Sequence, residues 1–220
     1  AEFIAKNLHI QLNVFAAAHE VRASKVLFFA SSCMYPGDCP QPMAERLLLT
    51  GRPEETSLPY AISKLAGLHM CLAFNRQYGS TLFIPVIPNS AFGPNDNFDP
   101  ASAHVLPALI ARFHHAKVSG AARVALWGTG RPRREFIHAD DIADACLFLL
   151  DSELAPDDLP VNIGIGTDCS IRELAELIAR VVGFTGRMEW DSSMPDGAAQ
   201  KLLDSSRLRT PNAFGATSAR

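Results

Sequence analysis

The sequence has no long apolar run and no excess of positive charge. No uninterrupted apolar stretch reaches the ~18 residues that a membrane-spanning helix needs. The first residues also lack the basic and apolar regions of a signal peptide. Lysine and arginine number 20 against 23 aspartate and glutamate, so no basic field indicates nucleic acid. We therefore expect neither a membrane nor a nucleic acid as a partner.

Cysteine is scarce and scattered. None of the five cysteines has the Cys-x-x-Cys spacing of a metal site: Cys33, Cys39, Cys71, Cys146 and Cys169. An odd, dispersed set fits reduced thiols in the cytoplasm better than a disulfide framework. The adjacent His114 and His115 do not share a helical face. The sequence thus predicts a cytoplasmic protein without a metal site.

What remains is an ordinary globular composition, 48% hydrophobic and 20% charged over 220 residues. Apolar periodicity predicts helices over residues 2–20, 60–77, 104–116, from Asp140 or Asp141 to about 150, and 171–183. Short apolar runs predict strands over residues 25–30, 82–87, 123–127 and 160–164. This alternation predicts an α/β fold with a mostly parallel sheet. Pro85 indicates that its strand lies at an edge or begins irregularly, and Ser170 with Glu173 predicts a capping box.

Tyr60 and Lys64 are the most informative pair. Four residues apart on a helix, they share one face, and a nearby ammonium favours the phenolate that acid–base chemistry at a hydroxyl needs. Such a pair also arises by chance in amphipathic helices. Ser31 and the segment from Asn89 to Ala91 each follow a predicted strand, so we expect both to face one crevice at the carboxyl edge of the sheet.

These features occur in an order that resembles a known family. The series Ser31-Ser32-Cys33 after a strand, Tyr60-x-x-x-Lys64, and Pro88-x-x-x-Phe92-Gly93-Pro94 resembles the extended short-chain dehydrogenase/reductases. Longer strings are similar to the branch of that family that makes GDP-L-fucose: Ser31–Pro36, Gln41–Glu45, Asn75–Gly79, Gly93–Phe98, His104–Pro107 and Arg134–His138. The resemblance covers nearly all of residues 1–207.

The resemblance implies a fold, a reaction and partners. It implies a Rossmann-like parallel sheet, here without its N-terminal part, and a small C-terminal substrate-binding domain. Residues 1–88 and 135–168 would form the dinucleotide-binding domain, and residues 89–134 and 169–220 the substrate-binding domain. The implied reaction is epimerisation at C3 and C5 of GDP-4-keto-6-deoxy-mannose and NADPH-dependent reduction at C4. The implied assembly is a homodimer through helices 2–20 and 60–77.

The resemblance also assigns residues to roles. Ser31, Tyr60 and Lys64 would form the reductase triad, and Cys33 and His104 the base and acid of epimerisation. A 4-keto group acidifies the C–H bonds at C3 and C5, so a thiolate can remove a proton and an imidazolium can return one. The implied NADP(H)-binding residues are Lys64, Pro88, Asn89, Ser90, Ala91 and His104, and the implied substrate-binding residues are Arg112, Trp127, Arg134 and Lys201. Taken alone, Cys33 reads as a small buried hydrophobe and Trp127 as strand core.

The sequence departs from the family pattern in three places. It has no G-x-x-G-x-x-G segment, so we expect the unit that holds the cofactor's pyrophosphate to be missing; Gly128-Thr129-Gly130 reads as a turn. Asn89-Ser90-Ala91 stands where the family usually has Thr-Asn and an aliphatic residue. The tail from Arg209 does not continue as the family's closing helix, as in a truncated or frameshifted chain.

Two alternatives stay open. One is a related nucleotide-sugar epimerase or dehydratase, against which the pair Cys33 and His104 argues because a simple 4-epimerase does not need it. The other is a catalytically silent chain that binds a nucleotide sugar or pairs with a fuller subunit.

Overall fold

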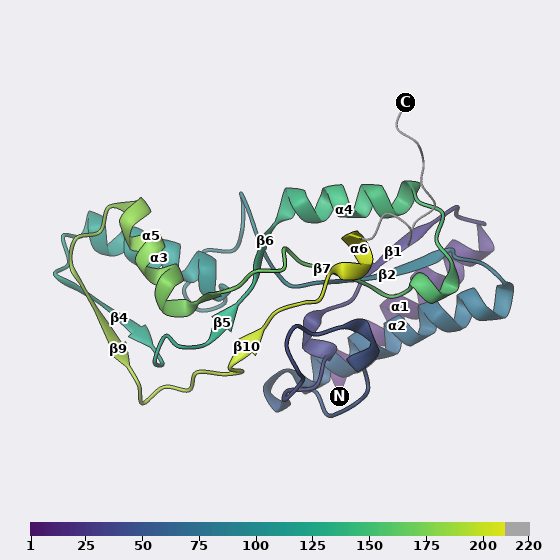
Figure 1. Cartoon of the computed structure of the whole chain (residues 1–220), viewed down its shortest axis with the longest axis horizontal. Helices are drawn as coiled ribbons and strands as arrows, with labels where there is room; N and C mark the ends of the chain where they lie inside the picture. The colour runs from purple at the N-terminus through teal and green to yellow at the C-terminus, as the bar shows by residue number, and fades with distance from the viewer. Residues whose placement is uncertain (210–220) are drawn as a thin grey trace.

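The chain folds around a three-stranded parallel sheet (Figure 1). This computed structural model describes residues 1–209. The sheet has the order β1 (Val26–Phe29), β2 (Phe83–Pro88), β7 (Val161–Ile163). Helices α1 (Glu2–Glu20) and α2 (Leu58–Tyr78) pack together on one face, and α4 (Ala139–Asp151) lies on the other (Figure 1). The predicted α/β fold with a parallel sheet is confirmed.

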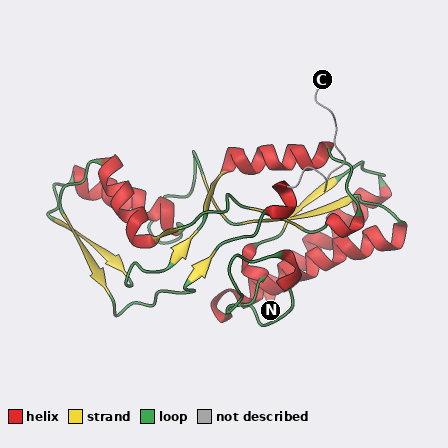
Figure 2. Cartoon of the chain, in the orientation of Figure 1, coloured by secondary structure: helices red, strands yellow, loops and turns green. Residues whose placement is uncertain are grey.

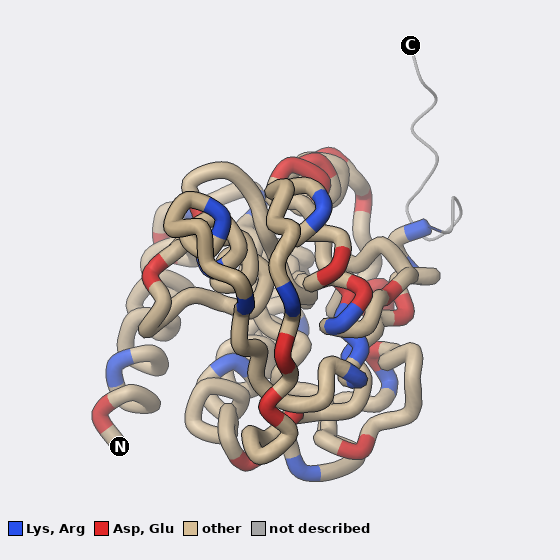
Figure 3. The backbone as a smooth tube through the Cα atoms, turned by 90° about the vertical axis from the view of Figure 1, so that its left-hand side faces the viewer, with Lys and Arg blue, Asp and Glu red and all other residues tan. Residues whose placement is uncertain are grey.

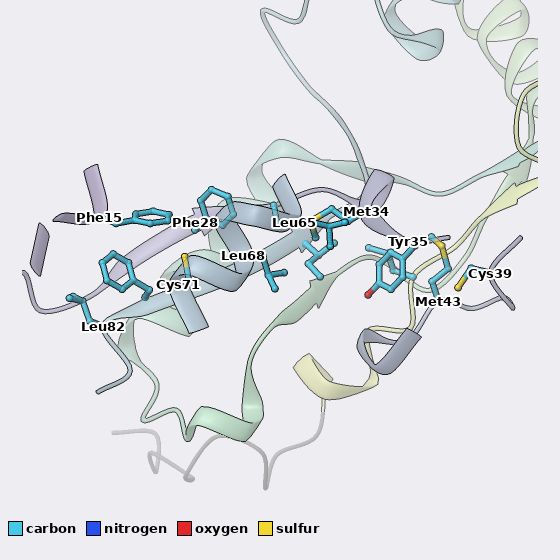
Figure 4. Close-up of a cluster of buried hydrophobic side chains, with 14 residues drawn as sticks. Phe15, Phe28, Met34, Tyr35, Cys39, Met43, Leu65, Leu68, Cys71 and Leu82 are labelled. Carbon is cyan, nitrogen blue, oxygen red and sulfur yellow. The ribbon is translucent and has the colours of Figure 1, made fainter. Parts of the chain in front are cut away.

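Strand β2 builds both cores because its side chains alternate between the two faces of the sheet. Phe83 and Ile87 join the cluster under α1 and α2, whereas Ile84 and Val86 join the cluster under α4; all four are fully buried. The first cluster runs from aromatic side chains around Phe15 to the sulfur-rich end near the turn after β1 (Figure 4). Buried side chains of this cluster therefore pack against the turn.

A second region lies at the far end of the molecule (Figure 1). Helices α3 (Val105–Val118) and α5 (Ile171–Val182) pack against each other over the parallel pair β4 (Arg123–Trp127) and β9 (Arg187–Asp191), with a core of their own. Strand β4 was expected with these bounds, whereas β9 was not. The predicted division into two domains stays a prediction.

Very short strands link the two regions (Figure 2). β3 (Ser90–Phe92) pairs with β6 (Phe136–His138), and β5 (Arg133–Arg134) lies between β8 (Cys169–Ser170) and β10 (Gln200–Lys201). Three short 3-10 helices lie between β1 and α2: η1 (Ser32–Met34), η2 (Glu45–Leu47) and η3 (Glu55–Ser57). A fourth, η4 (Pro156–Asp158), precedes β7. The chain ends its described part in α6 (Ser206–Arg209). The expectation for the tail concerns residues 210–220, which lie outside the described part.

The helix ends follow local chemistry. The capping box at α5 is confirmed, because Ser170 Oγ accepts from Glu173 N at 3.1 Å and the Glu173 carboxylate accepts from Ser170 N at 2.7 Å. The predicted aspartate cap of α4 is wrong: His138 caps it, with Nδ1 accepting from Asp140 N at 3.2 Å. The helix starts at Ala139, so Asp140 lies in the first turn, where a negative charge suits the helix dipole.

The expectation that Pro85 marks an edge strand is wrong, since β2 is the central strand of the sheet. Pro85 pairs with Phe28 of β1, but the ladder with β7 begins only at Val86. The missing N–H of Pro85 therefore interrupts no bond on the β7 side.

The carboxyl ends of β1 and β2 meet, as predicted. Ser32 Oγ, just after β1, donates to Asn89 Oδ1, just after β2, at 3.1 Å. Charged residues of both signs are mixed along the chain (Figure 3). Among residues 1–209, no helix is long and apolar enough to cross a membrane.

Candidate active site

The turn after β1 presents Ser31 and Cys33 at the carboxyl edge of the sheet. Ser31 has extended backbone and its Oγ accepts from Cys33 N at 3.2 Å, which starts η1. Ser32 points inward to Asn89, whereas Ser31 and Cys33 are half-buried. The turn therefore leaves a hydroxyl and a thiol accessible on one short segment.

Cys33 lies beside a lysine and interacts electrostatically with an arginine. Lys201 Nζ is 4.0 Å from Cys33 Sγ and 3.2 Å from Glu54 Oε2. Burial lowers the pKa of Arg134, and its electrostatic interactions with Glu54, Asp196 and Cys33 oppose that shift. Cys33, Glu54 and Lys201 line one small pocket. Two cations beside a thiol form a site that can receive an anionic ligand.

Tyr60 and Lys64 occupy the first turns of α2 and share a face, as predicted. Lys64 Nζ lies 5.8 Å from the centre of the Tyr60 ring and 5.3 Å from that of Phe28. It donates to Phe29 O at 2.7 Å, and burial lowers the pKa of Lys64. No hydrogen bond within residues 1–209 joins the Tyr60 hydroxyl to Ser31 or Lys64. An ammonium has three donors, so Lys64 can still donate to the hydroxyl groups of a bound nucleotide.

Asn89 is buried, and its amide is used within the protein. Nδ2 donates to Glu135 Oε2 at 2.9 Å and to Lys201 O at 3.2 Å, and Oδ1 accepts from Ser32. A side-chain contact to a cofactor is thus left to Ser90, which is half-buried, rather than to Asn89. The sequence-based assignment of Pro88, Asn89, Ser90 and Ala91 to the cofactor stays a prediction.

The four predicted substrate residues fall into two groups. Arg134 and Lys201 lie near Cys33, whereas Arg112 and Trp127 lie together in the second region, with the guanidinium 6.0 Å from the centre of the indole ring. Arg112 Nη1 also donates to Ala125 O at 2.8 Å. Trp127 is 66% exposed, so the interpretation of it as strand core is wrong.

His104 belongs to the second region of the molecule. It is exposed at the start of α3, and its side chain does not cap the helix. Within residues 1–209, no hydrogen bond or ion pair connects it to Cys33. Its assignment as the acid of the same reaction stays a prediction, in which the substrate would lie between His104 and Cys33.

Comparisons with known proteins place the chain in a family. Residues 1–164 match the NAD dependent epimerase/dehydratase family. The chain belongs to this family.

Its relatives within the family are longer than the chain. It is 52% identical over 208 residues to GDP-L-fucose synthase 1 of Arabidopsis thaliana, covering 94% of this chain and 64% of that protein. A GDP-6-OMe-4-keto-L-xylo-heptose reductase from C. jejuni has a similar structure (TM-score 0.88, 34% identity, 95% of this chain and 70% of that one). So has a GDP-L-fucose synthetase from Naegleria fowleri bound to NADP (TM-score 0.84, 28% identity, 96% and 67%). The chain spans about two thirds of the length of these family members.

Two acidic residues of this family member were missed by sequence reasoning. Glu54 binds Lys201, and Glu135 is fully buried beside Asn89. Glu135 lies inside the string Arg134–His138 that carried the resemblance, which was its only signal. Glutamate is almost never buried unless paired. From the sequence alone, both residues would therefore be expected at the surface.

Proposed function

We propose that the chain epimerises GDP-4-keto-6-deoxy-mannose at C3 and C5 and reduces it at C4 with NADPH, which gives GDP-L-fucose. The observation that carries the proposal is the grouping of Cys33 with Lys201 and Arg134, two residues after Ser31 at the carboxyl edge of the sheet. The identity of 52% to a relative named GDP-L-fucose synthase 1 supports the substrate.

In the reductive step, Tyr60 gives a proton to the C4 oxygen and Ser31 donates a hydrogen bond to the same oxygen. NADPH, when bound, supplies the hydride. Lys64 holds the ribose through the N–H groups that Phe29 O does not use. The neighbour bound to NADP supports this cofactor. Pro88, Asn89, Ser90, Ala91 and His104 complete the proposed cofactor contacts, with Asn89 contributing its backbone.

In the epimerising step, the Cys33 thiolate removes a proton from the carbon next to the 4-keto group, and His104 returns one from the opposite side. Arg134 and Lys201 bind the diphosphate, as their charges suit. Lys201 must then exchange its contact with Glu54 for the phosphate. Arg112 and Trp127 supply a guanidinium and a flat exposed ring for the rest of the nucleotide sugar.

We further propose the arrangement of the whole chain. Residues 1–88 and 135–168 serve the dinucleotide and residues 89–134 and 169–220 the sugar nucleotide. Helices α1 and α2 form the contact of a homodimer. The cytoplasm is the proposed location, which five free cysteines support.

A second candidate is reduction at C4 without epimerisation. It is favoured by the C. jejuni neighbour, whose name is that of a reductase. In this case Cys33 would bind substrate without removing a proton.

The first test is a fluorescence titration of the purified chain with NADPH, followed by turnover assays. Saturable binding and turnover of GDP-4-keto-6-deoxy-mannose are expected. Turnover of UDP-galactose alone would identify a 4-epimerase instead. A folded chain that binds no NADPH would be a silent member of the family, with Ser31, Tyr60 and Lys64 retained but unused.

A further inference from the structure

Glu135 is a charged side chain with no exposed surface. It lies between β5 and β6 and accepts three hydrogen bonds: from Asn89 Nδ2 at 2.9 Å, from Leu203 N at 3.1 Å and from Gly166 N at 2.7 Å. All three partners are donors. A carboxylate only accepts, and burying one is tolerated only when it is fully hydrogen-bonded. The surroundings are therefore shaped for the carboxylate itself.

The three donors come from chain segments that are distant in sequence. Asn89 follows β2, Gly166 follows β7, and Leu203 follows β10. The backbone is also fitted closely to the carboxylate: a Cβ on Gly164 would stand 2.6 Å from Glu135 Oε1. Glu135 thus ties the sheet's carboxyl edge to the segment that carries Lys201.

Asn89 extends this tie to the active-site turn. Its second N–H donates to Lys201 O at 3.2 Å, and its Oδ1 accepts from Ser32 Oγ at 3.1 Å. Ser32 lies between Ser31 and Cys33, and Lys201 carries the ammonium 4.0 Å from the Cys33 sulfur. A continuous set of hydrogen bonds therefore connects Glu135 to the segment that carries the thiol and to the segment that carries the neighbouring cation.

We infer that Glu135 is a positioning residue that fixes Cys33 relative to Lys201 through Asn89 and Ser32. It touches neither substrate nor cofactor. The expected effect on turnover rests on the proposed function, whereas the expected effect on the turn does not.

The test is the variant Glu135→Gln, read by hydrogen exchange in the absence of ligand. Glutamine has the same shape but turns an N–H toward groups that only donate. Losing one such bond loosens a segment by roughly tenfold, so exchange across residues 31–35 should rise about tenfold more than across residues 83–87. With the proposed substrate, kcat should fall on the order of 100-fold, as for a misplacement of about 1 Å, and KM should rise by a smaller factor because Lys201 is proposed to bind the diphosphate.

The matched control is Asn75→Asp, another isosteric exchange of a buried amide and acid. Asn75 bonds both the N–H and the carbonyl of Phe83 at the opposite end of β2. This variant should lower stability without a selective effect on residues 31–35. If Glu135→Gln does not fold, Glu135→Asp is read in the same way, because it keeps the acid but withdraws it from its three donors.

Selective exchange in Glu135→Gln or Glu135→Asp, absent in Asn75→Asp, supports the inference. Unchanged exchange across residues 31–35, or a rise spread evenly over the chain, would overturn it. An inactive wild type would contradict the proposed function but leave the exchange result to decide the role of Glu135.

Discussion

Tyr35 and Cys71 are ionisable side chains enclosed in one hydrophobic core cluster, Tyr35 at the end near the turn after β1 and Cys71 at the end near Phe28 (Figure 4). Burial raises the pKa of both, and the Tyr35 hydroxyl donates to Asn162 Oδ1 at 2.7 Å. Both groups therefore stay protonated in the folded chain at a pH at which the unfolded chain loses protons. Their contribution to stability is present below the unfolded pKa and is lost as pH rises.

The thiol of Cys71 makes this loss measurable. An unfolded thiol titrates near pH ~8.5, so the free energy of unfolding should fall above that pH by up to ~1.4 kcal/mol per pH unit for this group. In Cys71→Ala, the free energy of unfolding measured with urea should decline less as pH rises. The difference in this free energy between the wild type and Cys71→Ala should therefore shrink from pH 8.5 to pH 10, an interval of about one and a half units. Leu68→Ala, a change of a non-ionisable neighbour in the same cluster, should keep a constant deficit. A constant deficit in Cys71→Ala would contradict the argument.

Two substitutions should separate the two half-reactions. Tyr60→Phe keeps the ring that packs against Phe3 at 6.3 Å but removes the proton donor, so reduction should fall about 10²–10⁴-fold. Exchange of substrate protons at C3 and C5 with solvent should persist, because it depends on Cys33. In Cys33→Ala, this exchange should be abolished, whereas reduction should persist. NMR in deuterated water measures both, and equal loss of both activities in each variant would argue against separate roles.

Single residues were predictable from sequence where a motif carried them. Ser31, Tyr60 and Lys64 could be named because a strand end and a helical spacing locate them. Glu135 could not, since its burial depends on Asn89, Gly166 and Leu203, which lie far away in the sequence. The exposure of Trp127 was missed for the same reason: a strand residue is buried or exposed according to what packs on its face.

Among the elements, those with a clear apolar pattern of their own could be predicted, and length alone did not decide it: β7 with three residues was expected, whereas β9 with five was not. The long helices α1, α2, α3 and α5 and the apolar strands β1 and β2 were anticipated to within a few residues, because their apolar pattern is local information. The strands β3, β5, β6, β8 and β10 have two or three residues each. Such strands form because a distant partner offers hydrogen bonds, so their own sequence carries little signal.

Helix α1 leaves an apolar stripe uncovered. Phe3, Ile10 and Val14 are each about half exposed and fall on one helical face, and Ile62 of the adjacent α2 is 42% exposed. A contiguous apolar surface of this kind marks an interface. The helix pair is therefore the surface on which the proposed dimer depends.

Light scattering should give twice the 23.8 kDa mass of one chain. Ile10→Glu places a charge in the proposed contact and should yield the monomer. Val118→Glu, at an even more exposed apolar position on α3, should leave the dimer intact. A monomeric wild type at micromolar concentration, or dissociation by both variants, would contradict this contact.

The whole molecule places its chemistry where the sheet and the second region meet. The thiol and the serine come from the end of β1, the lysine and tyrosine from α2, and the cationic partners from β5 and β10. The sequence predicted the layers but not this junction, because the short strands and buried polar side chains that form it are long-range contacts. The account rests on these groups acting together on one substrate.

The most direct measurement is the isotopic composition of the product made from GDP-4-keto-6-deoxy-mannose and NADPH in deuterated water. The account predicts NADPH consumption with solvent deuterium at both C3 and C5 of the sugar. Reduction without deuterium at either carbon would contradict the role of Cys33 as a base. A folded chain that binds the nucleotide sugar but neither exchanges nor reduces it would contradict the proposed activity as a whole.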